Sequence, residues 1–144
     1  MRKPSVVVDT NLFISALILP QSKPGQLITA WKRDLFTLAT SVPMLVELEE
    51  VLKRPKYKKK YGITTAMRRT LIKGIKKRAV VIPTLKFPSI PIRDPKDAIV
   101  LATALDAHVN FLVTGDNDLL VLKNKSQILP LQIITVDKFL NKKV

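Results

Sequence analysis

Short apolar runs alternate along the chain with longer segments in which apolar residues recur every three or four positions. The first run, Ser5 to Val8, is continuous and rich in β-branched residues, which is typical of a parallel strand buried on both faces. The longer segments have the spacing of helices with one buried face. The pattern predicts strands at 5–8, 35–39, 80–82, 111–113 and 131–134, and helices at 11–19, 26–33, 43–53, 56–77 with a break near Gly62, 95–108, 119–122 and from 137 onward.

The regular alternation of strands and helices predicts an α/β fold, a three-layer sandwich with a central, mostly parallel sheet. A length of 144 residues fits a single domain, 1–144. No window is apolar over the 18 or so residues that a membrane span requires, so we expect no membrane association. The chain has no cysteine, which excludes a disulfide framework, a thiolate metal site and a cysteine nucleophile, and fits a cytoplasmic protein.

Acidic residues are scarce, and two of them follow predicted strands. The chain has 25 Lys and Arg against 11 Asp and Glu, a net charge of +14. Asp9 comes directly after Val8, and Asp116 follows Val113 by three residues. In a parallel sheet, ligands bind beyond the carboxyl ends of the strands. Either aspartate could instead only cap the next helix, but several acids converging on one edge favour a site.

Glu47 is singled out by its position on a helix. It lies on the apolar stripe of the third expected helix, three residues after Met44 and four before Val51. Glu49 and Glu50 lie off this stripe. A carboxylate that points inward is costly unless it is paired or binds a metal. Glu47 therefore needs a partner, unless it bends out to water from an edge position.

Two more aspartates lie near expected helix starts. Pro95 suits the first position of its helix, which makes Asp94 the N-cap and places Asp97 at the third position. Asp97 is then either a capping-box acid or a side chain that projects toward the strand-end aspartates. Asp118 is either a further acid of the same pocket or a first-turn charge favoured by the helix dipole.

A cluster of carboxylates would repel one another, and a divalent cation relieves this repulsion. The candidate ligands are all hard oxygens, and the chain has one histidine, His108, which is expected at the surface or in packing. This donor set argues against zinc and for Mg²⁺ or Mn²⁺. The sequence contains no Walker A loop, no Gly-x-Gly-x-x-Gly fingerprint and no Gly-x-Ser-x-Gly elbow.

Four motifs in order along the chain carry a family resemblance. From about residue 5 to residue 140, the sequence resembles a PIN-domain ribonuclease and is similar to the VapC-like toxins of toxin–antitoxin pairs. The motifs are Val7-Val8-Asp9-Thr10-Asn11, Pro43-Met44-Leu45-Val46-Glu47-Leu48 with Leu52-Lys53-Arg54-Pro55-Lys56, Arg93-Asp94-Pro95-Lys96-Asp97, and Val113-Thr114-Gly115-Asp116-Asn117-Asp118-Leu119-Leu120.

The resemblance implies a metal-dependent ribonuclease that uses Mg²⁺ or Mn²⁺ to hydrolyse RNA to 5′-phosphate and 3′-hydroxyl ends. It also implies a homodimer and, for a toxin, a small antitoxin that blocks the pocket. The implied site consists of the catalytic acids Asp9, Glu47, Asp97 and Asp116, the additional metal ligand Asp118, and Asn11 and Thr114, which orient the ligands by hydrogen bonds.

The basic residues concentrate on the helical hairpin expected at 56–77 and on the residues before it. We interpret this region as a phosphate-binding arm, on which Tyr57 or Tyr61 could stack on an unpaired base. The alternative is a solvated lysine-rich face around a narrow apolar stripe. The candidate RNA-binding residues are Lys53, Arg54, Lys58, Lys59, Arg68 and Arg69.

Other functions fit parts of the pattern. A housekeeping RNA-processing nuclease would carry the same site, and a non-catalytic nucleic-acid-binding module would keep the PIN-like shape. A receiver-like or phosphatase-like domain would also gather acids around Mg²⁺. A phosphatase of that kind would have Asp-x-Asp after the first strand, whereas here Asp9 is followed by Thr10 and Asn11.

Overall fold

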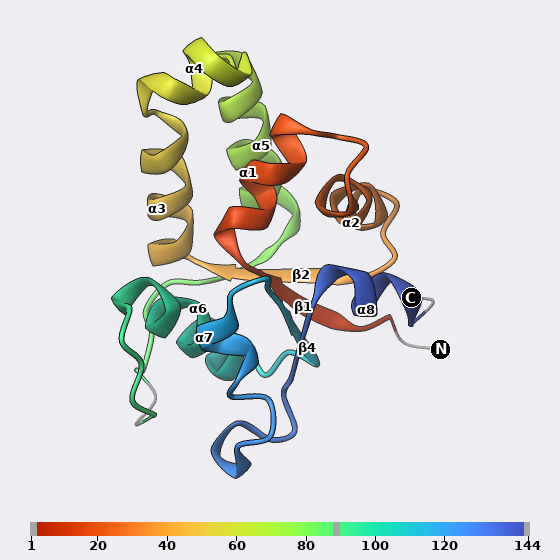
Figure 1. Ribbon diagram of the computed structural model, residues 1–144, viewed down its shortest axis with the longest axis vertical. Helices are drawn as coiled ribbons and strands as arrows, with labels where there is room; N and C mark the ends of the chain where they lie inside the picture. Colours follow the sequence, from red (N-terminus) through yellow and green to blue (C-terminus); the bar gives the residue numbers. More distant parts are fainter. Residues whose placement is uncertain (1–2, 88–89, 143–144) are drawn as a thin grey trace.

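The computed structural model describes residues 3–87 and 90–142, so positions 1–2, 88–89 and 143–144 of the expected domain lie outside it. Within the described residues, five parallel strands form one sheet in the order β3-β2-β1-β4-β5 (Figure 1). The expected α/β class with a parallel central sheet is therefore confirmed. The strands are β1 (Ser5–Val8), β2 (Thr37–Ser41), β3 (Val80–Ile82), β4 (Phe111–Val113) and β5 (Gln132–Ile134).

The central strand β1 is apolar throughout because both of its faces are covered. Successive side chains of a strand point to opposite faces. Val6 and Val8 pack in one cluster and Val7 in the other, and each of the three is at most 1% exposed. Val7 pairs with Ala39 of β2 and with Leu112 of β4. The continuous apolar run is thus explained by a strand that lies between two cores.

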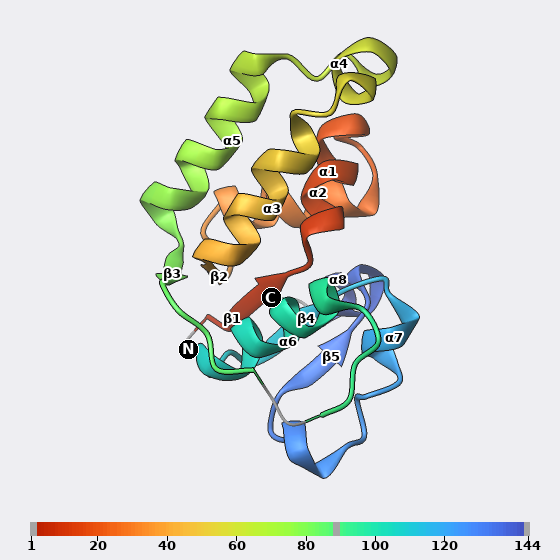
Figure 2. The ribbon, with the colours of Figure 1, turned by 90° about the vertical axis from the view of Figure 1, so that its left-hand side faces the viewer.

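Helices cover the sheet on both sides (Figure 2). The cluster around Val6 and Val8 contains residues from one set of helices, and the cluster around Val7 contains residues from the segments after β3. The first set is α1 (Thr10–Ile18), α2 (Lys23–Lys32), α3 (Val42–Leu52), α5 (Thr65–Arg78) and α8 (Val136–Asn141), and the second is α6 (Pro95–Asp106), α7 (Asn117–Leu120) and the 3₁₀ turn Ser126–Ile128. Within the described part of the chain, no helix has the length and apolar character needed to cross a membrane.

Helix α2 begins three residues earlier than its apolar spacing predicts. The side chain of Ser22 caps it, accepting a hydrogen bond from the Gly25 amide at 3.3 Å, and Pro24 lies in the first turn. Gly25 is required by close packing, because a Cβ atom there would lie 2.0 Å from the carbonyl oxygen of Pro20. The helix start is therefore set by capping chemistry, which precedes the apolar stripe.

Strand β2 lies two residues later than expected, at Thr37–Ser41 instead of 35–39. The turn before it passes through Asp34, which has a positive φ of 65°, and the Leu35 amide donates to Ala30 at 3.0 Å. Phe36 is fully buried and packs edge-to-face on Phe139 of α8, with ring centroids 5.5 Å apart. The turn therefore occupies the first of the expected strand residues. Apart from α2, the expected elements lie within two residues of the observed ones.

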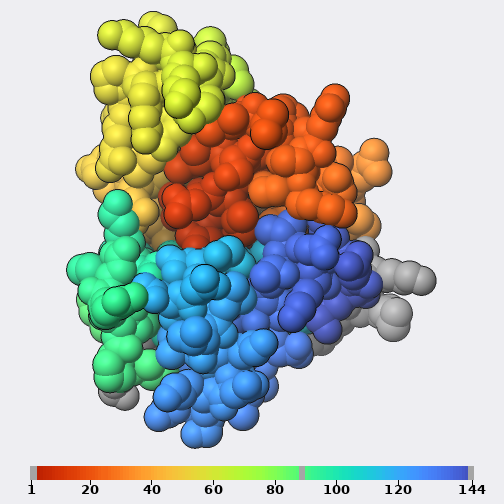
Figure 3. Space-filling view, in the orientation of Figure 1, coloured from red at the N-terminus to blue at the C-terminus, as the bar shows by residue number. Residues whose placement is uncertain are grey.

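The basic hairpin forms as expected, as α4 (Pro55–Tyr61) followed by α5. Gly62 ends α4 in the left-handed region, at φ 68°. Helix α4 buries none of its residues, whereas α5 buries Ile72 and Ile75. On the face shown in Figure 3, the α3–α4 segment in yellow lies beside α1 in red and extends beyond it.

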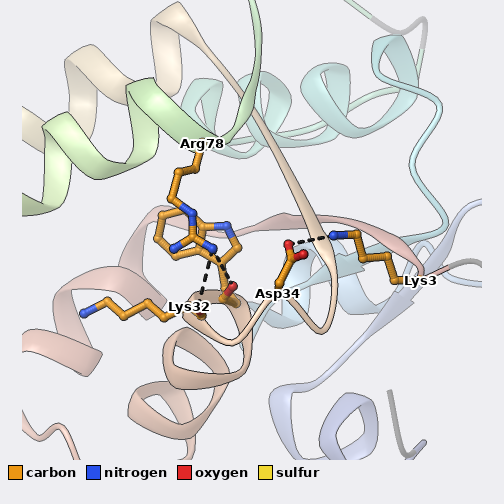
Figure 4. A network of polar contacts seen from close by, with 5 residues as sticks. Lys3, Lys32, Asp34 and Arg78 are labelled. Carbon is orange, nitrogen blue, oxygen red and sulfur yellow. Dashed lines mark hydrogen bonds and ion pairs between the residues drawn. The ribbon is translucent and has the colours of Figure 1, made fainter.

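The far end of α5 is anchored on α2 by Arg78 (Figure 4). Its guanidinium lies 5.0 Å from the centroid of the Trp31 ring and donates hydrogen bonds to the carbonyls of Trp31 and Lys32, at 3.2 and 3.4 Å. In the same region, Lys3 forms an ion pair with Asp34 at 2.6 Å. Arg78 is therefore engaged in packing, although it belongs to the basic hairpin.

Candidate active site

The topology brings the ends of β1 and β4 together at the point where the strand order reverses. Strand β1 pairs with β2, the next strand in the chain, along one edge and with β4 along its other edge. The carboxyl edge of a parallel sheet at such a point is where open α/β folds bind ligands. The Asp9 amide donates to the Val113 carbonyl at 3.0 Å, which holds the two strand ends side by side.

Asp9 is held by Thr114. The Thr114 hydroxyl donates a 2.7 Å hydrogen bond to Asp9 Oδ2 and accepts one from the Asp116 amide at 3.0 Å. The Asp9 side chain forms no capping hydrogen bond with α1, so the interpretation of Asp9 as only a cap is not supported. Burial raises the pKa of Asp9 above its usual value, and the Thr114 hydroxyl and nearby amides partly offset this.

Asp97 lies in the first turn of α6 and is buried. Asp94 caps this helix as expected, with Oδ1 accepting from the Lys96 amide at 2.9 Å. Among the described residues, Asp97 Oδ2 has no hydrogen-bond partner, and no capping-box bond from Asp94 to Asp97 is found there. Burial, with the nearby carboxylates of Asp116, Asp94 and Asp9, raises the pKa of Asp97 to about 7.

Asp116 caps a helix and also lies in a cluster of acids. Its Oδ1 caps α7 by accepting from the Asp118 amide at 2.8 Å. One carboxylate oxygen from each of Asp97, Asp116 and Asp118 also lies within 4.8 Å of the other two. Asp118 further accepts a 2.9 Å hydrogen bond from Arg93, which is largely exposed. These three oxygens are close enough to hold one cation together.

Glu47 is half-buried on α3 and lines a cavity that Asp9, Asp97 and Asp116 also line, so it does not bend away into solvent. Burial raises its pKa, and the positive charge of Lys96 opposes this increase. The cavity has a volume of about 220 Å³. It is lined by Asp9, Asn11, Glu47, Val51, Arg54, Tyr57, Asp94, Lys96, Asp97, Val100 and Asp116.

The structure thus brings the predicted quartet Asp9, Glu47, Asp97 and Asp116 to one cavity, from four different segments. Asn11 lines the cavity but is exposed, and Thr114 makes the hydrogen bond to Asp9 described above. Asp118 joins Asp97 and Asp116 without lining the cavity itself.

Besides Val51, Val100 and the predicted RNA-binding residue Arg54, the cavity is lined by Asp94, Lys96 and Tyr57, which the sequence does not place there. Asp94 was assigned only as a cap, although a cap at the start of a site-lining helix faces the same space. Lys96 lies between two site residues on α6, and its proximity in sequence could have indicated it. Tyr57 had no such signal, because its position depends on the turn between α3 and α4.

The predicted RNA-binding residues differ in accessibility. Lys53, Lys58, Lys59 and Arg69 are exposed, and Arg54 is exposed at the cavity. Arg68 is half-buried, and its Nε is buried with no hydrogen-bond partner among the described residues.

A larger cavity of about 680 Å³ lies between α1, α2 and α5, and its lining is mostly apolar. It contains none of the carboxylates and none of the predicted site residues. The size of a cavity therefore does not identify the chemical site in this protein.

A parallel α/β sheet with carboxylates gathered where its strand order reverses is the arrangement of an acidic ligand-binding domain. Comparison with known proteins shows which family this domain belongs to. Residues 5–118 match the sequence model of the PIN domain family, so the chain belongs to this family, as its motifs indicated. PIN domains are generally nucleases.

Two known proteins show the extent of the likeness. An uncharacterized protein of Methanocaldococcus jannaschii is 29% identical over 132 residues, which cover 92% of this chain and 83% of that protein. A chain of similar fold is found in the crystal structure of VapBC2 from Rickettsia felis, which is bound to a DNA fragment from the VapBC2 promoter. The TM-score is 0.56 at 16% identity, over 91% of this chain and 98% of the other.

Proposed function

We propose that the protein is a metal-dependent ribonuclease in which Asp9, Glu47, Asp97 and Asp116 are the catalytic carboxylates and Asp118 is an additional metal ligand. The observation that carries this proposal is the buried Asp97 carboxylate. One of its oxygens has no partner among the described residues, and it lies among other acids. Such an arrangement is unfavourable without a cation, because each carboxylate raises the free energy of its neighbours in the charged form.

The donor set fits Mg²⁺ or Mn²⁺. The oxygens available are carboxylates, with the amide of Asn11 nearby, and the chain contains no cysteine. His108, the sole histidine, does not line the cavity. Asp97, Asp116 and Asp118 would hold an ion between them, and Asp9 and Glu47 would approach it from β1 and α3. When bound, such an ion polarises a phosphate and lowers the pKa of a bound water.

The chain's own residues keep this site in place. Thr114 fixes one oxygen of Asp9, and the cap on α7 fixes one oxygen of Asp116, so both carboxylates are held in a set orientation. Arg54 and Lys96 line the cavity close to Glu47, where they would attract the phosphates of a substrate. We assign Thr114 and Asn11 supporting roles.

RNA is the proposed substrate because Arg54 and Lys96 line the cavity and exposed basic residues continue along the helical arm that begins at Arg54. Lys53, Arg54, Lys58, Lys59 and Arg69 are exposed on the α3–α4–α5 arm. Their positive charge would bind phosphates and guide the strand to the acids. Arg68 is the weakest candidate, because it is half-buried.

We further propose that this ribonuclease is the toxin of a toxin–antitoxin pair, with a cognate antitoxin and a homodimeric state. Support for this comes from membership of the PIN domain family and from the shared fold with a chain of VapBC2. Co-expression with the product of an adjacent gene tests this part. Rescue of growth by that product is the expected result, and full toxicity in its presence would contradict the pairing.

The enzymatic proposal is tested by incubating the protein with structured and unstructured RNA in Mg²⁺, Mn²⁺ or chelator. We expect cleavage only with metal. Asp116→Asn should abolish cleavage, because it removes a negative charge that would bind the metal. The asparagine oxygen can still cap α7, so the fold should be kept. Asp137→Asn is the matched control, since Asp137 is exposed on α8 and pairs with Lys23. Cleavage in chelator, or full activity of Asp116→Asn, would overturn the proposal. RNA binding without cleavage would indicate a non-catalytic module.

A further inference from the structure

Tyr57 supplies an aromatic wall to the acidic cavity. It lies on α4, four residues before Tyr61, and is half-buried. Among the described residues that line the cavity, it is the only aromatic one. Tyr61 is exposed and does not line the cavity. The sequence left the two tyrosines as equal candidates for base stacking, and the structure distinguishes them by position.

The backbone and the neighbouring ring hold Tyr57 in place. Its amide donates to Arg54 at 3.1 Å, and its carbonyl accepts from the Ile63 amide at 2.9 Å. The Tyr57 side chain packs against the core cluster that contains Ile63, and its ring centroid lies 5.9 Å from that of Tyr61, with a tilt of 31°. A ring held in this way loses little further conformational entropy when a ligand binds.

Positive charge lies close to this ring. Lys56 Nζ lies 5.1 Å from its centroid, and Arg54 and Lys96 line the cavity with it. Lysines continue along α4 at positions 58, 59 and 60. Proteins that bind single-stranded nucleic acid combine such a basic surface with aromatic rings on which bases stack. Packing of α4 alone would explain the half-buried ring, but not the convergence of the ring, the cations and the acids on one cavity.

The shape of the cavity disfavours a base-paired strand. Asp9 and Asp97 are each only 6% exposed, and the volume is about 220 Å³. A phosphate must therefore enter a narrow space to approach these carboxylates. A stiff A-form duplex presents its phosphates on a convex surface and keeps its bases stacked inside. An unpaired segment can bend into the cavity and turn one base outward.

We propose that Tyr57 is a stacking platform for an unpaired base next to the phosphate that enters the acidic cavity, with Arg54 and Lys96 binding phosphates beside it. The substrate class is thus an unpaired segment of RNA. This inference rests on the proposed ribonuclease function. Tyr57 is a substrate-positioning residue in this arrangement and takes no part in the chemical step.

The first test compares three variants of Tyr57 on a short unpaired RNA and on the same RNA annealed to its complement. Tyr57→Phe keeps the ring and should retain kcat/KM within about threefold. Tyr57→Leu keeps apolar bulk for the packing of α4 but has no aromatic face, and it should lose roughly tenfold or more. Tyr57→Ala should lose at least as much. Thermal melting of each variant identifies losses that come from unfolding, and Tyr57→Leu keeps the test valid if Tyr57→Ala does not fold.

The second test removes the base instead of the ring. Once the cleaved bond is mapped, single abasic nucleotides are placed on either side of it. With the wild-type protein, one such position should lose as much kcat/KM as Tyr57→Leu does. With Tyr57→Leu, the same abasic RNA should lose little more, because the ring and the base contribute through one contact. A purely structural role for Tyr57 would give independent, additive losses, which would overturn the proposal.

The outcomes separate this inference from the function on which it rests. Binding is also measured in an Asp116→Asn background, where RNA should remain intact. If no RNA is cleaved by the wild type but binding still depends on Tyr57 and on the unpaired base, the ribonuclease proposal fails and the stacking site stands. If the wild type cleaves RNA and Tyr57→Leu cleaves it equally well, the stacking site fails and the ribonuclease stands. Equal cleavage of the duplex, or a larger loss with Tyr61→Leu than with Tyr57→Leu, would also overturn the inference.

Discussion

The hydroxyl of Thr114 donates a buried 2.7 Å hydrogen bond to Asp9 Oδ2, across 105 positions of the sequence. The same oxygen of Thr114 accepts a hydrogen bond from the Asp116 amide. One side chain therefore joins the two strand-end aspartates of the site, and it stabilises the charged form of Asp9 against the effect of burial.

Thr114→Val should impair the site without disturbing its shape, because valine matches threonine in size but has no hydroxyl. The pKa of Asp9 should rise further, so the acid limb of the pH–activity profile in Mg²⁺ should move to higher pH. The buried Asp9 oxygen and the Asp116 amide would each lose a partner, and we expect a stability loss of about 1–3 kcal/mol. Urea denaturation measures this loss. Thr114→Ser is the control and should restore the profile. An unchanged profile for Thr114→Val would contradict this role.

The raised pKa of Asp97 predicts how the stability of the metal-free protein depends on pH. Its value is about 7 in the folded protein, against 3.8 for an ordinary aspartate. Between these values the folded state binds more protons than the unfolded state, so the contribution of Asp97 to stability falls as pH rises. Asp97→Asn removes this dependence.

The measurement is urea denaturation in chelator at about pH 5 and about pH 8. At the lower pH, Asp97 is neutral in the folded state, and Asp97→Asn should differ little from the wild type. At the higher pH, the variant should gain stability relative to the wild type, by on the order of 1–2 kcal/mol. Comparing the two proteins at each pH cancels the effect of the other titrating groups. A difference that did not change with pH would contradict the assignment, and added Mg²⁺ should reduce it by stabilising the wild type.

The cations at the cavity predict a specific salt dependence. Arg54→Ala should weaken RNA binding by the Asp116→Asn protein and reduce the slope of log K against log salt by about one. Lys138→Ala is the matched control, because Lys138 is exposed on α8, away from the cavity lining. Its slope should stay close to that of the parent. Equal slopes for all three proteins would show that Arg54 contacts no phosphate.

Two glycines predict opposite effects of the same substitution. Gly25→Ala should destabilise the protein by roughly 2 kcal/mol or more, because its Cβ would lie 2.0 Å from the Pro20 carbonyl oxygen, a backbone atom that cannot move alone. Gly74→Ala should stabilise it by up to about 1 kcal/mol, since Gly74 lies inside α5 with nothing within 4 Å of the added atom. Thermal melting measures both. A stabilising Gly25→Ala would contradict the packing between α2 and Pro20.

Local chemistry made much of the fold predictable. The apolar run at Val6, Val7 and Val8 indicated a strand buried on both faces, and Gly62 indicated the break between α4 and α5, because both features depend on neighbours in sequence. The later start of β2 was not predictable in the same way. Leu35 has the apolar character of a strand residue, but the turn at Asp34 and the burial of Phe36 against Phe139 exclude it from the sheet.

The candidate site follows the same division. Periodicity alone placed Glu47 on a buried face, and the sequence alone placed Asp9 and Asp116 after strands, since these are properties of one segment each. Whether a carboxylate caps a helix or faces a cavity depends on what packs opposite it. The structure therefore separates Asp9, whose side chain forms no capping hydrogen bond with α1, from Asp116, whose side chain caps α7 and also lies beside Asp97.

By itself, the sequence determined the α/β class and the parallel strands, because these depend on the character and spacing of residues along the chain. It offered the acids only as candidates, which the family resemblance grouped into one set. Only the tertiary structure decided that Tyr57, Lys96 and Asp94 face the same cavity as those acids. The physical reason is that the placement of α3, α4 and α6 around this cavity is fixed by contacts between segments far apart in sequence. No pattern within one segment encodes which side chain of another segment it will meet.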